Sequence, residues 1–211
     1  MSGKLRWQFL FVQALTLGRI PLIFVFLGVS VLAPNPPGDL WFNIAFWAMI
    51  LSAVTDLFDG YFARKFKVET RLGAYADPLT DKIFYLTAFP TLVFLAARGG
   101  QQHGHAQILL ALTILFLLRD QWVSFLRSIG AIYNVDAKAN WSGKARTVIS
   151  FPAICTIYYY LQAPRDWWLQ VHPIVIYAVE FATMAINLIS IWVYTAYYWP
   201  WIKKELQLPK R

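Results

Sequence analysis

The sequence predicts an all-α protein that crosses a membrane several times, and three observations support this. The 211 residues are 58% hydrophobic and 14% charged, whereas a soluble domain carries about 25% charged residues. Six apolar segments follow one another along the chain, at 8–33, 41–63, 82–97, 106–130, 147–163 and 173–199. Polar loops such as the Pro- and Gly-rich stretch 34–38 separate most of them. We therefore expect six transmembrane helices in a single membrane domain that spans residues 1–211.

The first segment runs from about Trp7 to Leu32 and is interrupted only by Gln13, Thr16 and Arg19. It is longer than the apolar region of a signal peptide, and no small-residue cleavage site follows it. We therefore expect this segment to remain in the membrane. The role of Arg19 stays open between pairing with an acidic group or a phosphate and simple extension of its head group to the interface.

Basic residues set the expected topology. Most of them fall on the side that holds both chain ends, and the opposite side keeps only Arg98 and Arg165. Because cytoplasmic flanks are enriched in Lys and Arg, both termini are expected in the cytoplasm. The same asymmetry accounts for the formal net charge of +8, since basic flanks meet anionic lipid head groups. No nucleic-acid partner is therefore expected.

Acidic residues concentrate where the second segment ends and the third begins. The chain has 11 acidic residues, and this region holds Asp56, Asp59, Asp77 and Asp81. Spacings of three and four residues place each pair on one helix face, and a short connection favours neighbouring helices. Four converging carboxylates repel one another and are costly to remove from water. They require positive charge, and divalent cations suit their hard oxygen atoms best.

Two other interpretations of these acidic residues remain. A salt-bridge cluster with Arg64, Lys82 and Arg127 would be purely structural, whereas a carboxylate-lined cation transporter would place acidic groups at mid-membrane depth. Zinc is disfavoured, because the single cysteine, Cys155, lies in another apolar segment and the three histidines fall on the opposite side of the membrane in the predicted topology.

The spacing of the acidic residues also resembles a known signature. The pattern D-x-x-D-G-x-x-A-R, eight residues, G-x-x-x-D-x-x-x-D is typical of the CDP-alcohol phosphatidyltransferase family. Every fixed position is matched, by Asp56, Asp59, Gly60, Ala63, Arg64, Gly73, Asp77 and Asp81. The signature lies across the second and third of the six segments, where the family carries it.

This resemblance implies an enzyme that transfers a phosphatidyl group from CDP-diacylglycerol to an alcohol and releases CMP. Asp56, Asp59, Asp77 and Asp81 would hold two Mg²⁺ or Mn²⁺ ions, and Asp81 would also act as the catalytic general base. The nucleotide and diphosphate site would include Asp56, Gly60, Ala63, Arg64, Thr70 and Gly73. Similar proteins are homodimers in a bacterial-type inner or plasma membrane, with the active site at the cytoplasmic face.

Three further segments resemble members of the family that use glycerol 3-phosphate. These are 15–21, 119–127 and 142–147, with Asp120 where Glu is usual and Arg146 where Lys is usual. The arginines and the lysine of the last two segments form a cationic set that suits an acceptor phosphate, namely Arg119, Arg127, Lys144 and Arg146. Positive-inside topology alone is the other explanation of this set.

Glycerol 3-phosphate is therefore the favoured acceptor, a small phosphorylated alcohol. Inositol phosphate, phosphatidylglycerol, serine and choline remain alternatives. The last segment also contains Glu180 and Asn187, seven residues apart on one helix face. These two side chains could pair with arginine, line a cavity or form hydrogen bonds between helices, and the sequence leaves these roles open.

Overall fold

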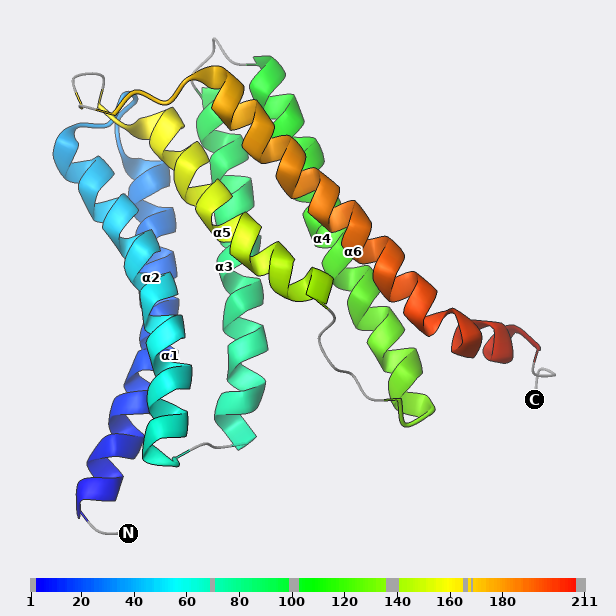
Figure 1. The fold of residues 1–211 in the computed structure, drawn as a ribbon. Helices are drawn as coiled ribbons and strands as arrows, with labels where there is room; N and C mark the ends of the chain where they lie inside the picture. Colours follow the sequence, from blue (N-terminus) through cyan, green and yellow to red (C-terminus); the bar gives the residue numbers. More distant parts are fainter. Residues whose placement is uncertain are drawn as a thin grey trace. The chain divides into compact units, whose positions relative to one another are not determined.

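The structure is a computed structural model. It describes residues 3–68, 71–98, 103–135, 141–164, 167 and 169–207, and within these ranges the side chains at 3–6, 56–57, 60, 71–78, 103 and 207 are not described. Every regular element in the described ranges is an α-helix (Figure 1). The helices are α1 (Gly3–Leu32), α2 (Asp39–Phe66), α3 (Arg71–Arg98), α4 (His103–Ile132), α5 (Trp141–Gln162) and α6 (Pro173–Gln207). The predicted all-α fold is confirmed.

Most helices extend beyond the apolar segments that predicted them. The largest extension is at α3, which begins at Arg71 although its apolar segment begins at residue 82. The polar residues of the signature therefore continue the helix toward its N-terminus. Polar residues can continue a helix because its backbone hydrogen bonds do not depend on apolar side chains. Hydropathy therefore locates the apolar part of a helix and does not locate its ends.

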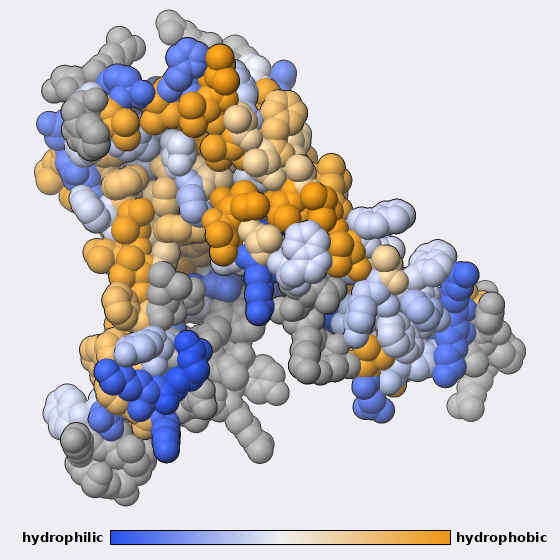
Figure 2. Space-filling model, viewed as in Figure 1, coloured by the Kyte–Doolittle hydropathy of each residue, from blue (hydrophilic) through white to orange (hydrophobic). Residues whose placement is uncertain are grey.

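Within the described residues, four of the helices contain a stretch that is long and apolar enough to cross a membrane. These stretches are Trp7–Leu32, Leu79–Arg98, Gly104–Ile132 and Pro173–Leu206. In α2 the apolar stretch is shorter, Asp39–Thr55, so the count of six spans remains a prediction. Large apolar side chains are exposed along the helices. Figure 2 shows hydrophobic residues in patches on the visible surface of the helices. The chain is an integral membrane protein.

The chain divides into two compact units, Met1–Ala106 with Ile157–Gln170, and Gln107–Thr156 with Val171–Arg211. In the first unit, α1 packs against both α2 and α3. Phe11 of α1 meets Phe62 of α2, with ring centroids 5.5 Å apart. Near the other end of α2, the fully buried Phe42 packs against Tyr158. These contacts hold α2, and with it the first half of the signature, against α1 and against the end of α5 that belongs to this unit.

In the second unit, α4 and α6 pack against each other. Their shared core contains Val123, Leu126, Tyr194 and Tyr198. Gly130 of α4 lies directly against the ring of Tyr198, and a side chain at position 130 would overlap that ring. The close approach of the two helices therefore depends on a residue without a side chain.

Candidate functional site

Asp59 is a buried carboxylate on α2. It is 3% exposed, and it lies one turn before Phe62, which packs against α1. A carboxylate removed from water in an apolar chain requires compensating charge or hydrogen bonds. Ala63 is half-buried and Arg64 is exposed on the last turns of α2, where an arginine is free to meet a ligand at the helix end.

Asp81 of α3 forms an ion pair with Arg19 of α1. The Nη2 atom of Arg19 donates a hydrogen bond to Oδ1 of Asp81 at 2.8 Å. The Arg19 side chain is 4% exposed and that of Asp81 is 48% exposed. The sequence left the role of Arg19 open, and the structure shows that it pairs with an acidic group, because a buried guanidinium does not extend to the interface.

The other members of the signature lie outside the described residues or side chains. The side chains of Asp56, Gly60, Gly73 and Asp77 are not described, although their backbone is helical, and Thr70 is not described at all. The predicted convergence of the four carboxylates therefore stays a prediction. Among described residues, no group of three or more His, Cys, Asp or Glu side chains lies close enough to hold a metal ion.

The donor set of this region fits Mg²⁺ or Mn²⁺. Asp59 and Asp81 both provide carboxylate oxygens, which are hard ligands. Both helices that carry them pack directly against α1. In the sequence, Asp56 precedes Asp59 by three positions and Asp77 precedes Asp81 by four. The signature contains carboxylates and no cysteine, a set of residue types that suits a hard divalent cation better than zinc.

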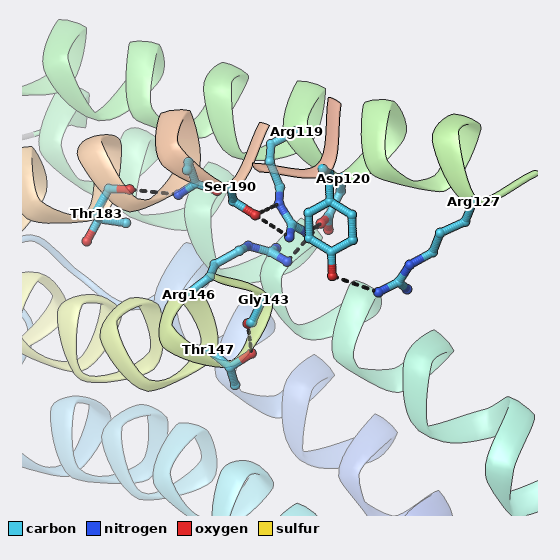
Figure 3. Close-up of polar contacts among 10 residues, drawn as sticks. Arg119, Asp120, Arg127, Gly143, Arg146, Thr147, Thr183 and Ser190 are labelled. Atoms are coloured by element: carbon cyan, nitrogen blue, oxygen red, sulfur yellow. Dashed lines mark hydrogen bonds and ion pairs between the residues drawn. The ribbon is translucent and has the colours of Figure 1, made fainter. Parts of the chain in front are cut away.

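A second group of charged residues lies in the other unit, between α4, α5 and α6 (Figure 3). Oδ1 of Asp120 in α4 forms two ion pairs. It lies 3.1 Å from Nη1 of Arg119 and 2.9 Å from Nη1 of Arg146 in α5. Arg119 is 5% exposed, and the Arg146 side chain is 11% exposed. One carboxylate thus lies between two largely buried guanidinium groups.

Side chains of α6 hold these arginines in place. Arg119 donates to Oγ of Ser190 from Nε at 3.0 Å and from Nη2 at 2.6 Å. Arg127 donates to the hydroxyl of Tyr194 at 3.1 Å. The guanidinium carbons of Arg119 and Arg127 lie 5.3 and 5.5 Å from the centroid of the Tyr194 ring, which is within the range of cation–π attraction. We call Arg119, Arg127 and Arg146 with Asp120 the arginine cluster.

Three of the four predicted acceptor-binding residues therefore come together, and the fourth does not join them. Lys144 is exposed on α5, and none of the contacts that hold the arginine cluster involves it. Its neighbour Gly143 is the residue that faces the cluster, because a Cβ there would lie 3.1 Å from the Tyr194 hydroxyl oxygen and 3.9 Å from Nη2 of Arg119.

The arginine cluster carries more positive than negative charge. Two largely buried guanidinium groups, those of Arg119 and Arg146, contact the carboxylate of Asp120. The exposed Arg127 adds a third positive charge beside Tyr194. Guanidinium groups that are removed from water are stabilised by an anion. Arginine also presents a planar set of donors that matches the oxygens of a phosphate. The cluster is therefore suited to bind a phosphate group.

Sequence reasoning did not identify the part of this site that α6 contributes. Buried polar residues recur there at spacings of three and four, as Glu180, Thr183, Asn187, Ser190 and Tyr194. This spacing places them on one helix face, and it is the signal that could have identified Ser190 and Tyr194. Asn187, whose role was open, donates to the backbone oxygen of Thr183 in its own helix at 2.7 Å.

Comparison with known proteins agrees with the signature. Residues 9–197 match the model of the CDP-alcohol phosphatidyltransferase family. A protein of Cereibacter sphaeroides named CDP-diacylglycerol–glycerol-3-phosphate 3-phosphatidyltransferase is 37% identical over 112 residues, which cover 51% of this chain and 47% of that protein. A probable phosphatidylglycerophosphate synthase of Mycobacterium tuberculosis is 33% identical over 113 residues, covering 53% of this chain and 49% of that protein.

An Escherichia coli protein with the same name as the first is 28% identical over 124 residues, covering 56% of this chain and 59% of that protein. The match thus spans about half the length of these relatives. No solved structure matches the chain.

Proposed function

Because this chain belongs to the CDP-alcohol phosphatidyltransferase family, we propose that it transfers a phosphatidyl group from CDP-diacylglycerol to glycerol 3-phosphate and releases CMP. The names of the similar proteins support this donor and this acceptor. The signature on α2 and α3 supports the chemistry, and the arginine cluster supports an acceptor that carries a phosphate.

In this proposal Asp56, Asp59, Asp77 and Asp81 hold two Mg²⁺ or Mn²⁺ ions. When bound, such ions neutralise the diphosphate of the donor and stabilise the charge on the attacking and leaving oxygens. Arg64 and the small residues Gly60, Ala63 and Gly73, with Thr70, would line the nucleotide and diphosphate site. The exposed position of Arg64 at the end of α2 suits a contact with a phosphate that approaches from the aqueous phase.

Asp81 is proposed as the base that takes the proton of the acceptor hydroxyl. The hydroxyl oxygen forms a bond to the phosphorus that remains with the lipid, the bond from that phosphorus to the CMP oxygen breaks, and the proton passes to the Asp81 carboxylate. The half-exposed side chain of Asp81 leaves room for a substrate beside it.

The observation that carries the choice of acceptor is the excess positive charge of the arginine cluster. Serine and choline bring no phosphate for these guanidinium groups to bind. Arg119, Arg127 and Arg146 would bind the phosphate of glycerol 3-phosphate, and the exposed Lys144 would attract it at longer range. We further propose a homodimer in a bacterial-type inner or plasma membrane, with the active site at the cytoplasmic face.

An acceptor panel tests the proposal. Purified protein in detergent receives CDP-diacylglycerol with Mg²⁺ or Mn²⁺ and one acceptor at a time, and CMP release is measured. The acceptors are glycerol 3-phosphate, inositol phosphate, inositol, serine, choline and phosphatidylglycerol. We expect CMP release with glycerol 3-phosphate, no release after chelation of the metal, and recovery when metal is restored.

Two results would contradict the proposal in separate ways. CMP release with another acceptor and not with glycerol 3-phosphate would keep the chemistry and reject the acceptor. Full activity of Asp81→Asn would reject the assignment of the base, since loss of a general base should lower kcat by about 10²- to 10⁴-fold. Arg146→Gln should raise the KM for glycerol 3-phosphate while leaving the KM for CDP-diacylglycerol unchanged.

A further inference from the structure

Arg19 lies deep in α1, where a guanidinium needs a specific partner. It is the seventeenth of the 30 residues of this helix, which places it about 24 Å from the helix start at 1.5 Å per residue. It is 3% exposed, and the stretch around it, Trp7–Leu32, is one of the candidate membrane spans. A buried charge in such a segment points to a functional role.

One partner of Arg19 is the residue proposed as the catalytic base. The contact joins Nη2 of Arg19 to Oδ1 of Asp81 at 2.8 Å. The guanidinium is buried and the carboxylate remains half exposed. One oxygen of Asp81 is therefore fixed from the protein interior, while the carboxylate as a whole stays open on its other side.

A second arginine joins the same two helices at their other end. Arg98, in the last turn of α3, donates from Nη1 to the backbone oxygens of Val31 at 3.3 Å and Ala33 at 2.7 Å, at the end of α1. These carbonyls lack partners within α1 because the helix stops there. Arg98 therefore also holds α3 against α1. Its contacts lie 12 or more residues along the chain from Arg19 and involve no carboxylate.

We propose that Arg19 is a positioning residue for Asp81. It holds one carboxylate oxygen and thereby directs the other toward the acceptor hydroxyl and the metal ions. This inference rests on the proposed function, in which Asp81 serves as base and metal ligand. A carboxylate tied at one oxygen loses rotational freedom, and a base misplaced by about 1 Å can cost about 10²-fold in rate.

The charge of Arg19 has an opposite effect on metal binding. A buried positive charge beside Asp81 repels an incoming divalent cation. Replacing Arg19 by Gln removes this repulsion and leaves a more mobile carboxylate. Metal affinity and turnover should then change in opposite directions, with tighter binding of Mn²⁺ and slower catalysis. A residue that only stabilised the fold would weaken both.

The test compares Arg19→Gln with Arg98→Gln in the full-length protein. Both changes remove an arginine that joins α1 to α3, and only the first touches a carboxylate of the signature. Three quantities are measured for each: steady-state kcat and KM with CDP-diacylglycerol and the preferred acceptor, Mn²⁺ affinity by electron paramagnetic resonance titration without substrate, and the thermal unfolding midpoint without metal.

For Arg19→Gln we expect kcat to fall by about 10- to 100-fold, both KM values to change by less than about threefold, and Mn²⁺ to bind at least about threefold more tightly. Arg98→Gln should lower the unfolding midpoint while keeping kcat within about twofold of the original. In Arg19→Ala, added guanidinium should restore part of kcat, whereas urea, which has the same shape and no charge, should not.

Several results would overturn the inference. They are an unchanged kcat in Arg19→Gln, an equal loss of kcat in Arg98→Gln, weaker Mn²⁺ binding in Arg19→Gln, and equal rescue by guanidinium and urea. Failure of the proposed function appears differently, as absence of CMP release by the unmodified protein with every acceptor. In that case the Mn²⁺ titration still tests whether Arg19 acts on Asp81.

Discussion

Tyr194 shows how one side chain can orient two others. Its ring is 1% exposed and lies near the guanidinium carbons of both Arg119 and Arg127. Its hydroxyl accepts a hydrogen bond from Arg127. Each cation–π contact contributes about 0.5–2 kcal/mol, depending on burial, so the ring favours one arrangement of the two arginines. If these arginines bind the acceptor phosphate, Tyr194 determines how well they are placed to do so.

We predict that Tyr194→Phe raises the KM for glycerol 3-phosphate by about 5- to 30-fold. The ring and its cation–π contacts remain, and the hydrogen bond from Arg127 is lost, which is worth about 1–2 kcal/mol. The KM for CDP-diacylglycerol should not change. Steady-state kinetics of CMP release measures both values. Tyr197→Phe, at an exposed position of the same helix, is the matched control, and equal KM values for acceptor in the two variants would contradict the prediction.

Sequence reasoning selected the arginines of this site but not the residues that hold them. Arg119, Arg127 and Arg146 are conspicuous because charge is scarce in an apolar chain. Tyr194 is not, since α6 contains several other aromatic residues and only its place on the polar face distinguishes it. Two of the departures from the family pattern, Asp120 and Arg146, contact each other at 2.9 Å. Asp is shorter than the usual Glu and Arg is longer than the usual Lys, so the two replacements together keep the acidic and basic groups within reach of each other.

At the scale of the helix, α2 and α4 end in the same way. Lys67 and Asn134 adopt left-handed backbone conformations, with φ of 55° and 53°. Backbone hydrogen bonds then run from Val68 to Ala63 and from Val135 to Gly130, which is the Schellman arrangement. In α2 the left-handed residue that ends the helix, Lys67, lies three residues after Arg64 of the signature. Neither position is glycine, the residue that most often marks such an end, and only Asn134 is of a type that also favours this conformation. The ends of these two helices therefore lie two to three residues beyond the apolar segments that predicted them.

The crossing of α4 and α6 gives a prediction for stability. In Gly130→Ala, the new methyl group would overlap the buried ring of Tyr198, and overpacking of this kind costs about 1–3 kcal/mol. We expect the thermal unfolding midpoint in detergent to fall by about 2–12 °C. Gly28→Ala in α1 is the control, because nothing lies within 4 Å of a Cβ there. An unfolding midpoint of Gly130→Ala at or above that of the control would show that the helices do not depend on this contact.

At the scale of the whole molecule, hydropathy predicted the class of fold and little of the packing. Six apolar segments became six helices, because in lipid the backbone must satisfy its own hydrogen bonds. The division into two compact units was not predicted. It falls inside α5, between Thr156 and Ile157, and the apolar segments on either side resemble one another in composition. Which helices pack together depends on particular contacts, such as that between Arg19 and Asp81, which hydropathy does not reveal.

The predicted topology depends on whether α2 and α5 also cross the membrane, and cysteine labelling decides this. With six spans and cytoplasmic termini, the loop after α1 and the loop before α6 face outward. The end of α2, the end of α4 and the last turns of α6 face the cytoplasm. The chain has one cysteine, Cys155, so Cys155→Ala provides a background in which each new cysteine is the only thiol.

In intact cells treated with a membrane-impermeant maleimide, we expect labelling of Asn35→Cys and Gln170→Cys. Lys67→Cys, Asn134→Cys and Lys203→Cys should be labelled only after the membrane is opened. All of these positions lie at or beyond helix ends or are exposed, so lack of labelling reflects the side of the membrane and not burial.

If α2 did not cross, Lys67 and Asn35 would share a side. If α5 did not cross, Asn134 and Gln170 would share one. Labelling of Lys203→Cys from outside would show that the orientation is the opposite of the predicted one. Asp59 and Asp81 would then lie on the side of the membrane away from the cytoplasm.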